Sequence, residues 1–325
     1  MDFFRTTPPP ESPSSLADEV LPCAPTLRAQ LILLSVSGLL WYFALPLIAQ
    51  RVIRPHAEAA PWRDRWAGFW TSWFQKSLQL HGLPAEQYFD QACVFTAILL
   101  QHFVGGLLCV PSVVGAPLAL AAPLARLGAL CEAGWEFQDV LTMIYQRLFG
   151  GEAGLKRFPN VVVIAQLVHH AMGLSMVVPM NLALGDDRAY HEFVFLLQGA
   201  AFIALATQGY GFTLDVKTRG GLRTMKLISA FTVLVLLYSR GVRYVVVAAQ
   251  LLRAIDGPLW YVGANAVGLM GLLNLAMTGD AAAKFVKFAR LSHNDAGVVE
   301  LHRQLSGSLS PHSPRTGGGN WKKEH

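Results

Sequence analysis

Two adjacent histidines, His169 and His170, interrupt the apolar stretch NVVVIAQLVHHAMGLSMVVPMNLAL. An imidazole is costly to place among aliphatic side chains, so a polar pair in such a stretch indicates a functional site. Imidazole also exchanges a proton near neutral pH, which suits it to general acid–base catalysis. Successive residues of a helix point about 100° apart. We therefore expect only one of the rings to face an interior cavity, and we favour His170.

Three carboxylates precede this pair at helical spacing. Glu132, Glu136 and Asp139 stand at i, i+4 and i+7 and share one helix face. Carboxylates placed in this way repel one another unless a proton or a cation intervenes. The sequence leaves four arrangements open: a neutral carboxylic acid, pairing with Arg240 or Arg243, contact with a histidine of the next apolar stretch, or a solvated helix face.

Further polar residues lie inside the apolar stretches and are candidates to support a site. Gln166 and Asn181 fall roughly on the helix face of His170. Amide groups in membrane helices are often interhelical contacts, worth only about 0.6 kcal/mol on average. The supporting residues that we expect around the histidine pair are Glu136, Asp139, Gln166, Asn181, Gln198, Gln208 and Arg240.

The cysteines do not indicate a metal or a disulfide framework. Cys23, Cys93, Cys109 and Cys131 are scattered, with no CxxC motif and no histidine at ligand spacing from them. Buried cysteines commonly serve as small apolar side chains. The sequence therefore predicts no metal site and no cofactor.

The elements that must position these residues are membrane helices. The chain is 53% hydrophobic and only 14% charged, whereas an average soluble domain is about 25% charged. A spanning helix needs roughly twenty apolar residues. We expect an all-α, polytopic membrane bundle of about seven helices, at 27–49, 89–110, 116–134, 160–184, 191–213, 227–251 and 259–279. Pro117 and Pro123 would kink the third, which could run on to Phe149 as a second, more polar helix, so residues 116–149 are compatible with one helix or two.

The basic residues indicate how the helices are oriented. Cytosolic loops collect Lys and Arg, and most basic residues follow the first, third, fifth and seventh expected spans, among them Arg51, Arg63, Lys156, Lys217 and Lys226. The opposite side holds only Arg5, Arg28, Arg188 and Arg253. We therefore expect a luminal amino end and a cytosolic carboxyl end. The first residues are polar and acidic, so we expect no cleavable signal peptide, and a nucleic-acid partner is not indicated.

The regions that flank the bundle have their own patterns. We divide the chain into a polar tail (1–26), the first span with an amphipathic helix (27–84), the bundle (85–290) and a Gly/Ser/Pro-rich cytosolic tail (291–325). In the second region Trp62, Trp66, Phe69 and Trp73 share one helix face, as in a helix that lies in the membrane interface or one that covers the mouth of the bundle.

The chain ends in NWKKEH. Lys322 and Lys323 resemble a dilysine signal that a retrieval coat reads on the cytosolic side, so we expect residence in the endoplasmic reticulum membrane.

Several of these segments together resemble the TLC family, which includes ceramide synthases and smaller lipid-handling proteins of the endoplasmic reticulum. The resemblance rests on CEAGWEFQDVLTMIYQRL, the HH pair about thirty residues later, a Gln/Tyr-bearing span and the F…LLYSR segment, and it covers roughly residues 85–285. It implies a bundle around a membrane cavity. In the acyl-transferring branch, paired histidines corresponding to His169 and His170 would be the catalytic residues.

The resemblance leaves two principal functions open. His191 and Glu192 stand where that branch has His-Asp, but Phe195 occupies the next acidic position. We therefore favour a protein that binds a lipid or acyl chain in a bundle cavity and influences lipid homeostasis. The alternative is an acyltransferase that takes acyl-CoA as substrate, with Glu136 or Asp139 orienting the catalytic histidine. A transporter or channel also remains open.

Overall fold

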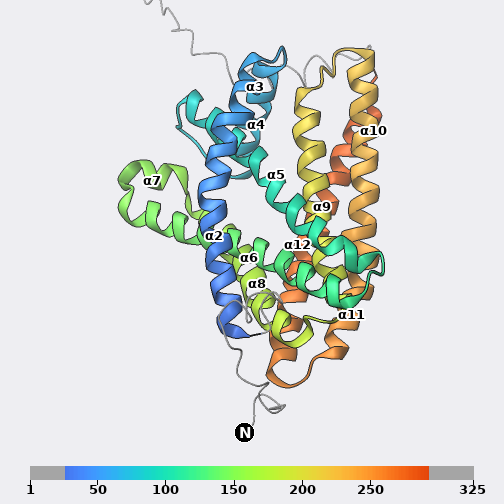
Figure 1. Ribbon diagram of the computed structural model, residues 1–325. Coiled ribbons are helices and arrows are strands. Elements are labelled where there is room, and N and C mark those ends of the chain that lie inside the picture. Colours follow the sequence, from blue (N-terminus) through green and yellow to red (C-terminus); the bar gives the residue numbers. More distant parts are fainter. Residues whose placement is uncertain (1–25, 293–325) are drawn as a thin grey trace, which may run out of the picture.

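The computed structural model describes residues 26–292, and within them every regular element is helical (Figure 1). The elements are α2 (Leu27–Ile48), η1 (Ala49–Ile53), α3 (Arg54–Ala59), α4 (Arg63–Ser77), α5 (Ala85–Val113), α6 (Leu118–Phe149), α7 (Gly151–Arg157), α8 (Asn160–Leu184), α9 (Arg188–Thr213), α10 (Arg219–Leu236), η2 (Leu237–Val242), α11 (Arg243–Ala254) and α12 (Gly257–Arg290). The η segments are π-helical turns. The predicted all-α class is confirmed for this part of the chain.

Six helical segments are long and apolar enough to cross a membrane, namely Leu27–Ala59, Ala85–Val113, Asn160–Leu184, Arg188–Thr213, Arg219–Ala254 and Gly257–Arg290. Many large apolar side chains on these helices are exposed, for example Phe43, Leu234 and Leu275 at 67–69%. A water-soluble domain rarely exposes so large an apolar surface. The described chain thus has the architecture of a multi-pass membrane protein.

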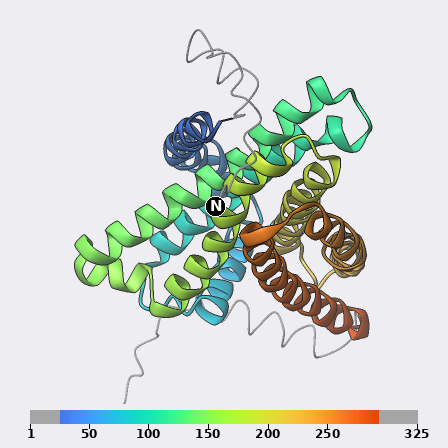
Figure 2. The ribbon, with the colours of Figure 1, turned by 90° about the horizontal axis from the view of Figure 1, so that it is seen from below.

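The expected third span differs most from the structure. Residues 116–134 belong to a single helix, α6, which continues to Phe149, so the open choice between one helix and two is resolved as one. α6 is not among the six membrane-length apolar segments. It runs obliquely across the bundle beside α2, and its end with α7 extends past α2 (Figures 1 and 2). The count of seven spans stays a prediction.

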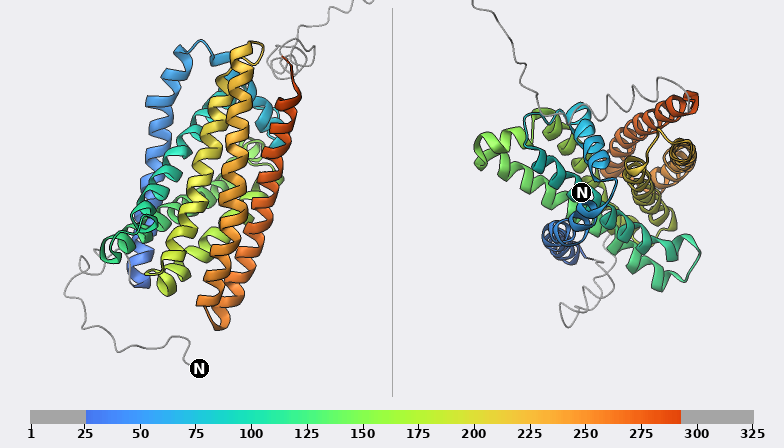
Figure 3. Two further views of the ribbon diagram at one scale, coloured as in Figure 1. Left: turned by 90° about the vertical axis from the view of Figure 1, so that its right-hand side faces the viewer. Right: turned by 90° about the horizontal axis from the view of Figure 1, so that it is seen from above.

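The two ends of the described chain lie at opposite ends of the bundle. α2 begins at one end and α12 finishes at the other (Figure 3). Basic residues tie elements together at the end where α12 finishes: Arg65 donates to the Thr213 carbonyl at 3.1 Å, and Lys226 to the Leu291 carbonyl at 2.7 Å. This separation of the ends agrees with an odd number of passes. Which end faces the cytosol stays a prediction.

Small residues let helices α2 and α6 approach closely. A Cβ on Gly134 of α6 would lie 2.8 Å from the backbone nitrogen of Gly38 on α2. At this crossing Trp41 and Ser37 donate to the Cys131 carbonyl at 3.1 and 3.3 Å. Small residues at helix crossings are typical of membrane bundles, where close packing replaces the hydrophobic effect as the driving force.

The expected amphipathic helix exists as α4. Trp66, Phe69, Trp70 and Phe74 are buried. The rings of Trp70 and Phe74 pack on Phe95 of α5, and Trp70 also packs on Phe212 of α9. Trp62 and Trp73, which we placed on the same face, are only partly buried. The helix therefore packs these aromatic rings against the bundle. This agrees with the second of the two alternatives, a helix that covers the mouth of the bundle.

The remaining regional predictions lie outside the described residues. They are most of the polar tail 1–26, most of the tail 291–325, and the dilysine pair Lys322 and Lys323. Cys93, Cys109 and Cys131 are buried, and the burial of Cys93 and Cys109 is in line with their expected role in apolar packing.

Candidate functional site

A cluster of polar side chains lies between α5, α6 and α8, inside the otherwise apolar bundle. α6 contributes the predicted carboxylate stripe, α8 contributes the histidine pair, and α5 contributes two residues that the sequence analysis did not select. The cluster comprises Gln101, His102, Glu132, Glu136, Asp139, His169 and His170. We call it the polar cluster below.

The sequence positions these side chains on their helices. α6 follows Pro117, and α8 follows Pro159. Proline has no N–H to leave unpaired at a helix start. From these starts the i, i+4 and i+7 spacing directs the α6 carboxylates toward α8, which packs beside α6.

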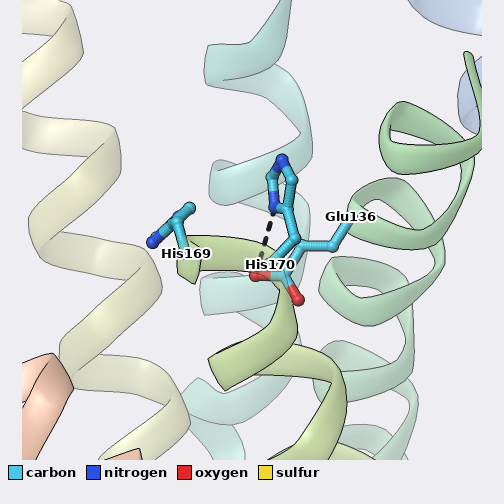
Figure 4. Close-up of side chains that lie close together, drawn as sticks. All are labelled: Glu136, His169 and His170. Atoms are coloured by element: carbon cyan, nitrogen blue, oxygen red, sulfur yellow. Dashed lines mark ion pairs between the residues drawn. The ribbon is translucent and has the colours of Figure 1, made fainter. Parts of the chain in front are cut away.

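His170 is a fully buried member of the cluster that contacts both Glu136 and Asp139. Its side chain has no exposed surface, and its Nε2 lies 3.0 Å from Oδ2 of Asp139. Its Nδ1 faces Glu136, whose Oε1 is 3.9 Å away (Figure 4). The indole of Trp135 meets the imidazole edge-on, with ring centroids 5.3 Å apart. Contact with a histidine of the next span was one of the four arrangements left open for the carboxylates, and it is the one observed for Glu136 and Asp139.

Glu136 lies in a space made by a glycine. Its side chain is 3% exposed, and its Oε2 has no hydrogen-bond partner within the described residues. A Cβ on Gly173 of α8 would overlap the Glu136 carboxylate. The glycine is therefore what allows this carboxylate to lie against the turn that carries His169 and His170.

His169 occupies a different environment, as the 100° offset predicted. Its ring centroid is 5.3 Å from that of His170, and it is only partly buried. Its Nδ1 is enclosed but has no partner among the described residues. Glu132 and Arg240 lie close enough to interact with His169 electrostatically.

Glu132 has its own partners on α5. His102 Nδ1 lies 3.2 Å from Glu132 Oε2, and the Gln101 amide donates to the same oxygen. Sequence reasoning missed this pair. The signal was present, since Gln101 and His102 form an adjacent polar pair within the apolar run AILLQHFVGG, as His169 and His170 do in theirs.

Arg240 does not pair with the carboxylates of α6, which was one of the open arrangements. It donates from Nη1 to Asn274 Oδ1 at 2.8 Å and from Nη2 to the Leu197 carbonyl at 2.6 Å. Arg240 Nε and Asn274 Nδ2 are buried donors without a partner in the described chain. The π-helical turn η2 carries this arginine, and such turns recur at functional sites.

The other arginine of that segment also lies apart from the polar cluster. Arg243 binds both carboxylate oxygens of Glu192. The neighbouring His191 contacts Ser112 Oγ at 2.7 Å and the Gly185 carbonyl at 2.9 Å. The residues compared with the second ceramide-synthase stretch therefore hold helix ends together away from the histidine pair.

The predicted supporting amides do not converge on His170. Asn181 donates to the Arg126 carbonyl at 3.3 Å, and Gln198 donates to the Gly128 carbonyl at 3.1 Å. Gln166 and Gln208 are half-buried, and Gln208 Nε2 is unpartnered in the described chain. Gln166, His170 and Asn181 lie on roughly one face, but they cannot meet at one point, because Asn181 lies eleven positions after His170, about three turns along the helix.

Two surface hollows lie elsewhere on the bundle. One is an open groove of about 360 Å³ between α4, α5 and α9, lined by Trp66, Thr96, Leu99, Ala206 and Tyr210 among others. The other lies along the outer face of α2. Neither includes a residue of the polar cluster. Neither hollow is therefore the cavity that we expected at the histidine pair. What marks that place is a group of buried polar atoms without hydrogen bonds.

One subset of the polar cluster has the composition of a metal-ligand set. The donor atoms of Glu136, His169 and His170 all lie within 4.8 Å of one another. The sequence predicted no metal, because no histidine stands at ligand spacing along the chain from a cysteine. This trio combines two helices.

Comparison with known proteins adds no assignment. The chain matches no family model, no curated protein and no solved structure.

Proposed function

We propose that this chain is a multi-pass membrane protein of the endoplasmic reticulum that binds a lipid at the polar cluster and so influences membrane lipid composition. The observation that carries the proposal is a set of buried polar atoms with no hydrogen-bond partner among the described residues. They are Glu136 Oε2, His169 Nδ1, His170 Nδ1, Arg240 Nε and Asn274 Nδ2.

Such atoms are expensive in a membrane bundle. A buried polar group without a hydrogen bond costs roughly 1–3 kcal/mol, and the hydrocarbon core offers no water in compensation. Three of them belong to the polar cluster, and the other two belong to Arg240, which interacts electrostatically with His169, and to Asn274, which is bonded to Arg240. Together they favour a bound polar group that satisfies them. The apolar surroundings favour a ligand whose remainder is an alkyl chain.

The two sides of the site differ in chemistry. Glu136 offers an acceptor, while Arg240 and Asn274 offer donors. A headgroup that fits both carries a hydroxyl or amide N–H together with a carbonyl or other acceptor oxygen. The open groove between α4, α5 and α9 is apolar enough to take part of a chain.

The location and the physiological role rest on other observations. The TLC-like arrangement of segments supports a lipid-handling role in the endoplasmic reticulum. The resemblance of Lys322 and Lys323 to a dilysine signal supports retrieval to that membrane by a cytosolic coat.

The test is the lipid that copurifies with the protein. The full chain is purified in mild detergent, and bound lipids are extracted and counted per chain by mass spectrometry. We expect one lipid class to be enriched over the bulk membrane, and His170→Ala or Arg240→Gln to lower its occupancy severalfold. The exposed His81→Ala serves as the control and should retain it. A wild-type protein without an enriched lipid would overturn the proposal.

A second function is favoured by one contact. Asp139 accepts from Nε2 of His170, which leaves Nδ1 as a base in the manner of carboxylate–histidine pairs that orient a catalytic imidazole. With acyl-CoA as donor, His170 would take the proton from an amine or hydroxyl that attacks the thioester carbonyl. The C–S bond would then break, and the leaving CoA thiolate would take up that proton. Membrane fractions given labelled acyl-CoA and a panel of acceptors test this function, since product formation must depend on His170.

A further inference from the structure

Three side chains of the polar cluster present free donor atoms to one another. Glu136 reaches from α6 toward the turn of α8 that carries His169 and His170 (Figure 4). Their donor atoms lie within 4.8 Å of one another. Glu136 Oε2, His169 Nδ1 and His170 Nδ1 are all buried without hydrogen-bond partners in the described chain. We propose that these three residues bind one divalent transition-metal ion of the zinc class.

The donor set has the composition that such ions prefer. Two imidazoles and one carboxylate form a common zinc ligand set that leaves further positions for water or substrate. Ligand atoms in a tetrahedral zinc site are separated by roughly 3.3 Å, given bonds of about 2.0–2.1 Å. His170 Nδ1 and Glu136 Oε1 are already 3.9 Å apart. All three donors lie within 4.8 Å of one another, so side-chain rotations that shorten these distances by up to about 1.5 Å would bring them to ligand distance.

The residue behind His170 supports the same assignment. A metal-bound histidine usually donates its other ring N–H to a carboxylate, which fixes its orientation. Asp139 Oδ2 lies 3.0 Å from Nε2 of His170 and is in that position. This contact directs the Nδ1 lone pair toward Glu136, where the ion would lie.

The charge around the site also favours a cation. Glu132, Glu136 and Asp139 bring three carboxylates to one face of α6, of which Glu132 lies against His102 and Asp139 is partly exposed. The nearest buried arginine, Arg240, directs its two terminal nitrogens to Asn274 and to the Leu197 carbonyl. A divalent ion would offset the remaining negative charge. The arrangement without a metal is a protonated His170 between Glu136 and Asp139, and the experiment below separates the two.

The inference goes beyond the proposed lipid binding. A metal with open positions would bind an oxygen of a headgroup directly, but the lipid could also be held by the polar side chains alone. Lipid retained after treatment with a chelator would leave the proposed function intact while separating it from the metal.

The experiment measures metal content in the full chain. The protein carries a tag free of histidine and is purified in detergent, and metals are quantified by inductively coupled plasma mass spectrometry. We expect about one zinc-class ion per chain. His169→Ala, His170→Ala and Glu136→Gln should each lower the content about tenfold or more. The exposed His81→Ala should leave it unchanged.

A conservative variant guards against misfolding. His170→Cys keeps a metal-binding side chain at this position. After removal of bound metal and loading with cobalt(II), it should show a thiolate-to-cobalt charge-transfer band that the wild type lacks. Wild-type protein that takes up neither zinc nor cobalt, or a cobalt-loaded cysteine variant without this band, would overturn the proposal. Loss of metal from His81→Ala as large as from His170→Ala would do the same.

Discussion

His170 of α8 is fully buried, and its Nε2 lies 3.0 Å from Oδ2 of Asp139 on α6, whose side chain is 30% exposed. The contact joins two helices that pack side by side in the bundle. It also sets the orientation of the imidazole, because only the ring edge that carries Nδ1 then faces Glu136. Both the proposed lipid site and the proposed metal site depend on this orientation.

Replacement of Asp139 by Asn should destabilise the protein modestly. The variant keeps the size of the side chain but loses the charge that strengthens the bond to His170. We expect the free energy of unfolding to fall by about 1 kcal/mol, measured by thermal unfolding in detergent micelles. Asp280→Asn, which removes an exposed i,i+4 pair with Lys284, should change it by no more than about 0.5 kcal/mol. Equal effects of the two variants would contradict the assigned role of Asp139.

Gly173→Ala should disturb the site through Glu136. The added Cβ would overlap the Glu136 carboxylate, so either the helices move apart or the carboxylate leaves its position. We expect a loss of about 1–3 kcal/mol and a decrease in bound lipid. Gly268→Ala on α12 is the matched control, because nothing lies within 4 Å of its Cβ. It should be neutral or slightly stabilising, since Ala favours helix over Gly by up to about 1 kcal/mol.

Arg240→Gln should loosen the junction between α9, η2 and α12. The variant loses the bonds to Asn274 and to the Leu197 carbonyl, and it leaves buried acceptors behind at a cost of about 1–3 kcal/mol. Hydrogen exchange should quicken in α12 around Asn274. The exposed Arg253→Gln should show wild-type exchange there, and an unchanged pattern in Arg240→Gln would contradict the prediction.

Cysteine labelling should decide whether α6 crosses the membrane. In a background with Cys23 replaced by Ser, the exposed positions Val114, Lys156 and Lys217 are changed to Cys one at a time. With a membrane-impermeant maleimide on sealed microsomes, we expect Lys156→Cys and Lys217→Cys to react from the cytosolic side. Val114→Cys should react only after permeabilisation. Labelling of Lys156→Cys and Val114→Cys from the same side would show that α6 does not span.

The carboxylate stripe shows how far the sequence could go. Helical periodicity placed Glu132, Glu136 and Asp139 on one face, and the apolar run placed His170 on the next long helix. A contact between the two was among the arrangements that the pattern left open. It could not be selected from the pattern, because Arg240 was an equally plausible partner by charge. The choice depends on the oblique course of α6 and on the space that Gly173 leaves for Glu136.

Gln101 and Asn181 show that helical spacing alone does not identify contacts between helices. Asn181 shares a helix face with His170 yet bonds to Arg126, and Gln101, which carried no spacing signal to the histidine pair, binds Glu132 in the polar cluster. Periodicity reports only neighbours on the same helix. Contacts between helices depend on crossing angles and on where small residues let backbones approach.

The sequence by itself determined that this protein is helical, that most of its helices are long and apolar enough for a membrane, and that polar groups interrupt them at His169 and His170. These properties follow from composition and period, which need no knowledge of neighbours. Only the tertiary structure decided that Glu136, His169 and His170 present free donor atoms to one another, that Asp139 orients His170, and that Arg240 binds Asn274. The reason is physical, since each of these relationships joins residues on different helices, and their meeting is set by packing in three dimensions.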